Sequence, residues 1–339
     1  MSIEIGGSSI GEVYVGDKAI SEIYKGSDLV WSAYTPEINY IFRDIDSNGN
    51  LTLATGNLAD ASEITKISDY GLAYAFNQHS SITGSVSFPN LKTVGGECCL
   101  INAFYGCSNI TGLVSFPALS SVNGYGCFNH TFYQCAELTD ITFPNLTSIN
   151  GVRCFDNAFY GCTKLTNLDL SSLVTIKGAY CFDTAFQFCT NLSGVDFSSL
   201  TTVDGNQAFY GTFASCANIS SVDFSSLTTI SSTSCFFSAF HGCTKLTNVT
   251  FPLLEKIENN CFFRCFYDCT SLNSLSFPAL TSNSFGRYTN QFEQMLRGVT
   301  GCTVHFPSNL QSVIGSWSDV TGGFYGTNTT VLFDLPATE

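Results

Sequence analysis

The chain has few charged residues, and this shortage limits what it can bind. Charged residues make up 12% of the 339 residues, about half of the usual share. Only 13 are Lys or Arg against 27 Asp or Glu, which gives a formal net charge of −14 at pH 7. Such a surface repels phosphate, so the composition argues against nucleic acid as a partner.

Long apolar runs and a secretory signal are also missing. No run approaches the ~18 apolar residues that cross a bilayer, so we expect no membrane insertion. The start of the chain, MSIEIGGSSIGEVYVGDKAI, lacks the basic segment and apolar stretch of a signal peptide. We therefore expect either export by another route or release of the protein as part of a larger particle.

Motifs that carry chemistry are absent as well. The four His (His79, His130, His241 and His305) are scattered, and neither a P-loop nor a GxGxxG occurs. No C-x-x-C is present and no His stands at a ligand spacing, which argues against zinc. We expect no catalytic residue, no cofactor and no resident metal.

One stretch resembles the first half of a calcium loop. In DIDSNGN, the residues Asp44, Asp46, Asn48 and Gly49 match D-x-D-x-N-G, but Thr55 stands where the closing Glu belongs. A hairpin turn at Asn-Gly is the alternative interpretation.

Phenylalanine, by contrast, is abundant and regularly spaced. The chain has 30 Phe, and eight of them recur at intervals of 26 to 28 residues: Phe76, Phe104, Phe132, Phe159, Phe186, Phe213, Phe240 and Phe266. A fixed period in this range predicts a solenoid.

Each repeat predicts two short strands and a return segment. In LTNLDLSSL, Leu168 and Leu170 alternate with Asn167 and Asp169, as in a strand with one buried face. A second stretch buries Ile176, and a Gly turn follows in which we expect positive φ. Because each strand pairs with its copy in the next coil, ~4.8 Å away, the stack should contain a parallel sheet.

The repeat resembles the BspA-like class of leucine-rich repeat proteins, which carry a phrase close to AF-x-x-C-x-x-L-x-x-I-x-[IF]-P. The resemblance covers about residues 76–282, although the CF segment lengthens the unit here. It implies a β-rich leucine-rich repeat solenoid with capped ends that serves in adhesion.

Cysteine falls mostly in two columns. Thirteen of the sixteen occupy them: Cys99, Cys127, Cys154, Cys181, Cys235 and Cys261 in one, and Cys107, Cys135, Cys162, Cys189, Cys216, Cys243 and Cys269 in the other. A catalytic cysteine would not be copied in every coil, and free Cys packs as a small hydrophobe, so we predict reduced, buried columns. Disulfides between coils are the alternative, but Ala208 interrupts the first column. Cys98, Cys265 and Cys302 lie outside the columns, and we predict that they are more reactive.

Four domains are predicted. Residues 1–34 form a small β module, because GEVYVGDKAI aligns with SEIYKGSDLV at a ten-residue period. Residues 35–75 form an N-terminal cap, residues 76–282 the solenoid and residues 283–339 a C-terminal cap. The β module resembles short modules of tail-associated proteins from phages that infect gut bacteria, which implies attachment to a larger particle or self-association.

Slots that vary between coils predict the surface. They follow CF (Ile101, Asn129, Asp156, Asp183, Tyr210, Phe237, Phe263), precede it (Gly126, Arg153, Tyr180, Gln207, Ser234, Asn260) or follow AF (Tyr105, Tyr133, Tyr160, Gln187, Ala214, His241, Tyr267). Exposed Tyr rows stack on sugars or anchor protein partners, so Tyr105, Tyr133, Tyr160, Tyr267, Arg153 and Tyr180 are candidate ligand-binding residues. Surface drift is the alternative.

A row of carboxylates is a second candidate. Asp169, Asp196 and Asp223 occupy one strand slot in successive coils, where they could share a cation or contact sugar hydroxyls. A solvated face is the alternative.

These observations favour a non-enzymatic recognition protein. The first hypothesis is a phage tail or virion-associated adhesin that binds a bacterial surface receptor. The second is a bacterial cell-surface or secreted adhesin that binds a host protein or glycan. A carbohydrate-active enzyme that uses the Asp row is a third.

Overall fold

The computed structural model describes residues 66–67, 69–78, 80, 82–282, 291–314, 326 and 328–337. From residues 1–65 it describes only short strands, in four antiparallel pairs. These strands are β1 (Ile3–Ile5), β2 (Ser8–Ile10), β3 (Val13–Val15), β4 (Lys18–Ile20), β5 (Leu29–Val30), β6 (Ile41–Phe42), β7 (Asp44–Ile45) and β8 (Leu51–Thr52). Asp46, Asn48 and Gly49 of the calcium-like stretch lie outside the described residues, as does His79. The predicted domain boundaries stay a prediction.

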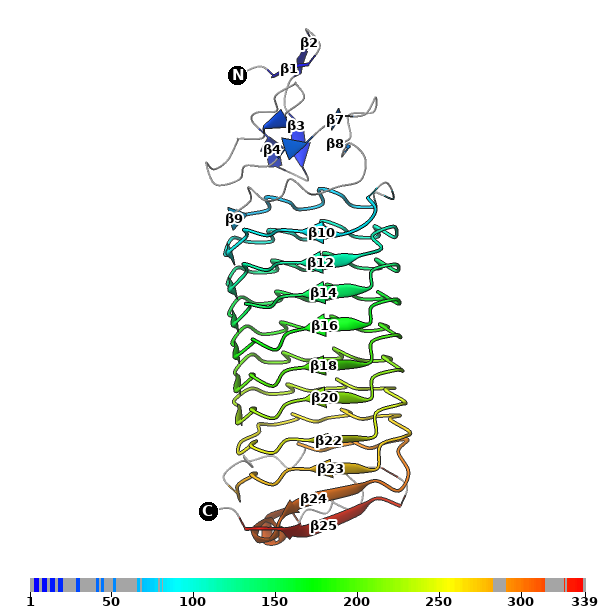
Figure 1. Ribbon diagram of the computed structural model, residues 1–339. Helices are drawn as coiled ribbons and strands as arrows, with labels where there is room; N and C mark the ends of the chain where they lie inside the picture. The colour runs from blue at the N-terminus through cyan, green and yellow to red at the C-terminus, as the bar shows by residue number, and fades with distance from the viewer. Residues whose placement is uncertain are drawn as a thin grey trace.

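From residue 66 onward the chain winds into a solenoid of about nine coils (Figure 1). Strands on one side form a parallel sheet in the order β10 (Val86–Ser87), β12 (Leu113–Ser115), β14 (Asp140–Thr142), β16 (Asn167–Asp169), β18 (Gly194–Asp196) and β20 (Ser221–Asp223). The same side continues with β22 (Asn248–Thr250), β23 (Ser274–Ser276), β24 (Thr303–Pro307) and β25 (Thr330–Leu335). We call the outward surface of these strands the sheet face. The predicted parallel solenoid is confirmed.

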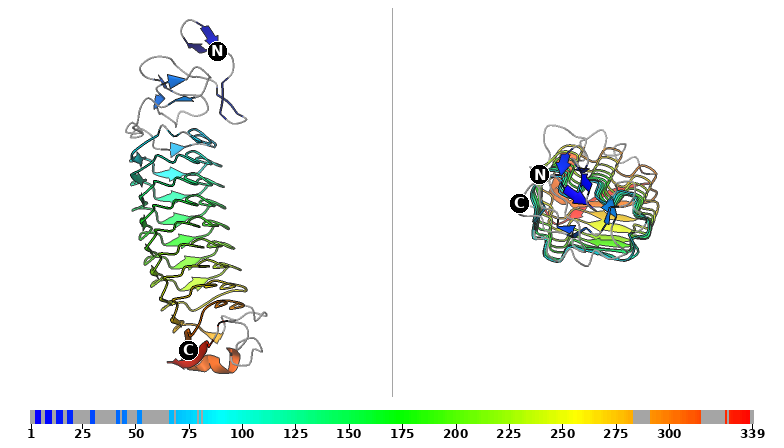
Figure 2. Two further views of the ribbon diagram at one scale, coloured as in Figure 1. Left: turned by 90° about the vertical axis from the view of Figure 1, so that its right-hand side faces the viewer. Right: turned by 90° about the horizontal axis from the view of Figure 1, so that it is seen from above.

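A second parallel sheet follows the first along each coil. Its order is β9 (Lys66–Ile67), β11 (Thr93–Val94), β13 (Ser121–Val122), β15 (Ser148–Ile149), β17 (Thr175–Ile176), β19 (Thr202–Val203) and β21 (Thr229–Ile230). Near the C-terminus lie a 3-10 turn (Ser308–Leu310) and the short helix α1 (Gln311–Ile314). Viewed down the stack, the coils superpose (Figure 2).

Each coil closes with ten residues of consecutive turns, which we call the turn segment. Examples are residues 152–161 and 179–188. Within the segment, alternate N–H groups bond differently: Phe182 donates to Ala208 of the next coil, whereas Ala185 donates back to Phe182. Every fourth residue has a positive φ, as at Tyr180, Thr184 and Phe188. We call the outward surface of the turn segments the turn face.

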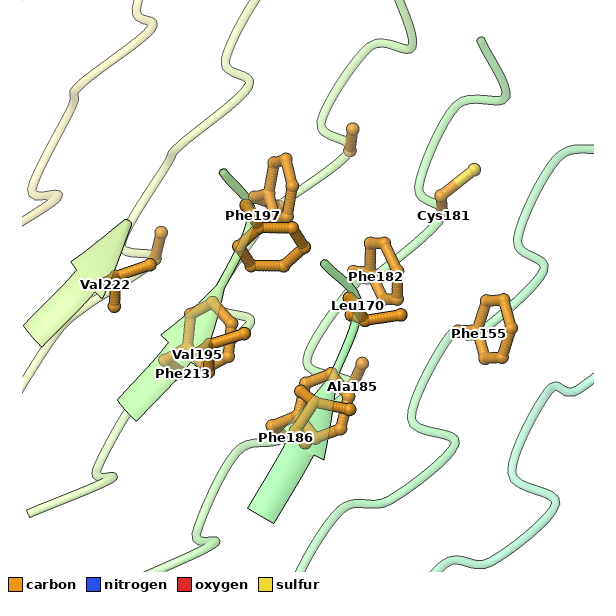
Figure 3. Packing of buried hydrophobic residues seen from close by; sticks show 14 of the residues in the cluster. Phe155, Leu170, Cys181, Phe182, Ala185, Phe186, Val195, Phe197, Phe213 and Val222 are labelled. Carbon is orange, nitrogen blue, oxygen red and sulfur yellow. The ribbon is translucent and has the colours of Figure 1, made fainter. Parts of the chain in front are cut away.

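Phenyl rings stack along the core in step with the coils. Phe182 stacks on Phe155 at 5.3 Å and on Phe209 at 5.6 Å between ring centroids, and edge contacts join this column to the next, as between Phe197 and Phe209. Figure 3 shows Phe182, Phe186 and Phe197 within this packing, beside side chains of the sheet. The regular Phe spacing in the sequence therefore reflects aromatic columns shared by the sheet side and the turn side.

The cysteines line the same interior. All sixteen are buried as free thiols, and most donate to carbonyl oxygens within the turn segments or at the glycine just before them. Cys162 Sγ donates to Phe132 O at 3.2 Å, and Cys181 Sγ donates to Gly151 O at 3.2 Å and to Gly178 O at 2.9 Å. A thiol is small, costs little to bury and still supplies a weak donor to a buried carbonyl. The predicted burial of the columns is confirmed.

The three cysteines outside the columns are buried too. Cys265 and Cys302 have no exposed surface, and burial raises the pKa of both thiols, that of Cys302 to about 12. The prediction that these two are more reactive than the columns is therefore wrong, because reactivity needs an accessible thiolate. Cys98 is 5% exposed, and burial likewise raises its pKa.

The glycine before each turn segment is required not for positive φ, as predicted, but for another structural reason. Gly124, Gly151, Gly178 and Gly205 do not adopt positive φ. Instead, a Cβ at each would overlap the carbonyl oxygen of a residue in the preceding coil, such as Gly151 beneath Gly178. These positions require glycine because two backbones meet there.

Candidate binding surface on the turn face

The turn segments present side chains outward without needing them for backbone pairing. Arg153 N donates to Ala179 O at 2.8 Å and Tyr180 N donates to Asn206 O at 2.9 Å, so the backbone of these positive-φ residues is held by the neighbouring coil. Side chains there are free to differ between coils. This accounts for the variable slots in the sequence.

Three of the predicted tyrosines form a continuous row. The rings of Tyr105, Tyr133 and Tyr160 stack at 4.8 and 4.7 Å with interplanar angles of 4° and 5°. Phe188 packs edge-on against Tyr160 at 5.3 Å, and His130 lies 5.3 Å from Tyr133. Tyr133 therefore has a tyrosine ring on each side, and the contact of this row with a sugar or a protein partner stays a prediction.

Arg153 and Tyr180 are also brought together. The Arg153 guanidinium lies 4.6 Å from the centre of the Tyr180 ring, and its Nη1 donates to Asp156 Oδ2 at 2.5 Å. The other oxygen of Asp156 accepts from Asn157 Nδ2 at 2.6 Å. Asp156 is therefore a buried, satisfied carboxylate rather than the water-facing group that the sequence predicted.

Asp183 occupies the same slot as Asp156, one coil later. Burial and the Asp156 charge raise the pKa of its carboxyl to about 6, and Arg153 opposes them. In the coil before that of Asp156, burial lowers the pKa of His130. Asp183 therefore titrates near pH 6, and the pKa of His130 lies below the ordinary range of an imidazole.

Other predicted surface slots are buried. Gly126, Ala214 and Ser234 are enclosed although neighbouring coils expose the same slots. At Gly126 the space beside the backbone is taken by Cys98 Sγ, 3.3 Å from where a Cβ would lie. Small residues there reflect local packing and not contact with a ligand.

The last coils hold a second aromatic row in a different slot. Tyr210, Phe237 and Phe263 stack at 4.9 and 4.7 Å. Tyr267, the fourth predicted tyrosine, is separate from the first row; His241 packs against its ring at 4.7 Å and the Arg297 guanidinium lies 5.6 Å away. We did not predict the contribution of Arg297 or of Arg264, which lies 5.2 Å from the Phe263 ring. Phe263, which directly precedes Arg264, was the available signal for Arg264, whereas Arg297 is distant from Tyr267 in the sequence.

The carboxylate row lies on the sheet face, on the other side of the core. Asp169, Asp196 and Asp223 pair in register along β16, β18 and β20. One oxygen of each accepts from a backbone N–H two residues later, as at Asp196 and Ser198 (2.8 Å). The row lines an open hollow of about 770 Å³ together with Asn167 and Gly194. In the described part of the chain no three His, Cys, Asp or Glu converge as metal ligands.

Comparison with known proteins shows the family. A model of the BspA type leucine rich repeat region matches residues 101–238 and 211–316, which is more than half of the chain. The chain therefore belongs to this family of leucine-rich repeat proteins, and no enzymatic family is indicated. No curated protein matches it.

Solved structures of low identity are similar in outline. The T. pallidum leucine rich repeat protein is 19% identical over 54% of this chain and 72% of its own, with a TM-score of 0.36. A leucine-rich repeat protein from Bacteroides ovatus is 16% identical over 79% and 88%, with a TM-score of 0.30. A leucine rich cell surface protein from Faecalibacterium prausnitzii is 19% identical over 79% and 83%, with a TM-score of 0.29.

Within the described residues, no helix has the length and apolar character needed to cross a membrane.

Proposed function

We propose that the protein is a non-enzymatic recognition protein that binds a cell-surface partner through the turn face of its first five coils. One observation carries this proposal: the exposed large apolar side chains of the described residues gather there. Five of the nine lie on these turn segments: Tyr70, Tyr74, Tyr125, Val152 and Phe188. Exposed aromatic groups beside Arg are typical of binding hot spots.

The stacked tyrosines support the same surface. Their hydroxyls form a line of hydrogen-bonding groups, one per coil, beside Phe188 and the Arg153–Tyr180 pair. Such a line offers directional contacts next to apolar ones, which suits a protein partner.

In its specific form, we propose a phage tail or virion-associated adhesin that binds a bacterial surface receptor. The resemblance of residues 1–34 to phage modules supports this, but those side chains lie outside the described residues. A bacterial cell-surface or secreted adhesin that binds a host protein or glycan is equally compatible with the family. Virion structural genes beside the coding sequence support the first form, and chromosomal surface genes support the second.

A paired set of variants tests the binding face. Changing Tyr105, Tyr133 and Tyr160 together to Phe removes the hydroxyls but keeps the stack, and we expect at least tenfold weaker binding of the labelled full chain to receptor-bearing cells by flow cytometry. The matched control changes Asp169, Asp196 and Asp223 together to Asn, and we expect binding to be retained. Loss with the control set and retention with the Tyr set would move the site to the sheet face.

A further inference from the structure

Asp183 is a carboxylate without a cation of its own. Within the described residues, no Lys or Arg nitrogen lies within 4 Å of it, and the nearby Arg153 is bound to Asp156 at 2.5 Å. Two carboxylates in successive coils thus lie near one guanidinium. Arg153 bonds to Asp156, whereas Asp183 has a hydrogen bond with the Thr184 side chain and no ion pair within 4 Å in the described residues.

An aromatic ring occupies the same slot in the coil that follows. Tyr210 is the first ring of the stack formed with Phe237 and Phe263, so one of its faces is covered by Phe237 at 4.9 Å. No described ring covers the other face, which points toward the coil of Asp183. The face of an aromatic ring attracts cations and repels carboxylates. The Tyr210 ring face and the Asp183 carboxylate therefore repel each other, and each would attract a cation.

The partial burial of Asp183 strengthens this mismatch. Burial and Asp156 raise the pKa of Asp183 to about 6, so at pH 7.5 the carboxylate is charged but incompletely solvated. A cation that approached from solvent would replace the missing hydration. The net charge of −14 adds a long-range attraction for such a group.

We propose that Asp183, with Tyr210 in the same slot of the next coil, binds a lysine or arginine side chain of a protein partner. The ammonium or guanidinium group contacts the carboxylate, and the aliphatic stem lies along the Tyr210 ring. This inference rests on the proposed function and names the chemistry of the partner at that surface.

The test uses hexalysine as the probe and isothermal titration calorimetry on the full chain at pH 7.5. We expect Asp183→Asn to weaken hexalysine binding about tenfold, the size of one lost charge-assisted hydrogen bond. Asp196→Asn on the sheet face removes the same charge and should change affinity less than twofold. Equal losses in the two variants would show general attraction to an acidic protein and overturn the proposal.

A pH series sharpens the test. The charged groups that act on Asp183 are Asp156 and Arg153, and the Thr184 side chain hydrogen-bonds with it. His130 interacts with Asp156. Lysine stays charged from pH 5 to 7.5, so binding to the natural chain should weaken as the pH falls through about 6. Asp183→Asn should abolish this dependence, whereas His130→Gln should keep it. A flat profile in the natural chain would overturn the inference.

The two proposals fail separately. If the Tyr→Phe set still binds cells while hexalysine binding depends on Asp183, the proposed function fails and the cation site stands. If the Tyr→Phe set abolishes cell binding while Asp183→Asn leaves hexalysine affinity unchanged, only the cation site fails.

Discussion

The sheet face and the turn face enclose the same core, yet their outward residues are under different constraints. On the sheet face one slot holds Thr142, Asp169, Asp196, Asp223 and Thr250 in successive coils. The Asp side chains there accept from the backbone after each strand, so they help shape the corner. A turn-face slot instead holds Arg153, Tyr180, Gln207, Ser234 and Asn260. The turn backbone pairs through its own N–H groups, which leaves these side chains free to differ between coils, although Ser234 is buried.

The strongest test of this comparison removes a ring that both sides share. Phe182→Ala should lower the free energy of unfolding by about 3–5 kcal/mol, because the ring is fully enclosed between Phe155 and Phe209. The matched control is Phe188→Ala on the same turn segment, where the ring is 40% exposed; about 1 kcal/mol or less is expected. Denaturant unfolding measures both. Similar losses of stability in the two variants would mean that Phe182 and Phe188 do not differ as buried and exposed residues.

Close backbone contact gives the next effect. Gly178→Ala should cost about 2–3 kcal/mol, because the new Cβ overlaps Gly151 O and one backbone has to move. Gly95→Ala is the control: nothing lies within 4 Å of its Cβ position, so a change of about 0.5 kcal/mol at most is expected. The melting temperatures of the two variants compare them. A neutral Gly178→Ala would contradict the reason given for this glycine.

Removing a thiol from a cysteine column should lower the free energy of unfolding by less. Cys181→Ala should cost about 1–2 kcal/mol, because the Sγ donor to Gly151 O and Gly178 O disappears with some packing volume. Ala208 already occupies this column one coil later, so the stack tolerates alanine there. Thr244→Ala on the exposed surface is the control and should be nearly neutral. If Cys181→Ala were as stable as the natural chain, the thiol hydrogen bonds would contribute nothing measurable to stability.

The smallest expected effect is on the pH dependence of the free energy of unfolding, which should differ between variants of the two faces. The pKa of Asp183 is about 6 when folded and ~3.9 when unfolded, so the unfolded chain ionises first and stability falls as the pH rises from about 4 to 6. Asp183→Asn should remove this fall and add about 1 kcal/mol at pH 8, after allowance for solvent screening. Asp196→Asn on the sheet face is the matched control for the removal of one carboxylate. Denaturant titrations at several pH values measure this, and a persistent slope in Asp183→Asn would assign it to another group.

The solenoid could be predicted from the sequence because the same pattern of buried residues recurs in every coil. Eight spaced Phe residues and the Leu168–Leu170 alternation report burial directly, and burial determines how the coils pair. The sequence did not reveal why Gly178 is glycine, since positive φ and close approach select the same residue. It also did not reveal that Tyr105, Tyr133 and Tyr160 cover one another or that Asp156 is buried by Arg153, because these depend on contacts between coils.

The alternating N–H groups of the turn segments have a mechanical consequence. Half of them point along the stack axis into the next coil, as Phe182 does toward Ala208. Tension applied between the two ends of the stack would act along that axis. The force then acts on the few hydrogen bonds between two adjacent coils at a time. The solenoid would therefore unfold one coil after another and become longer before the whole structure is lost.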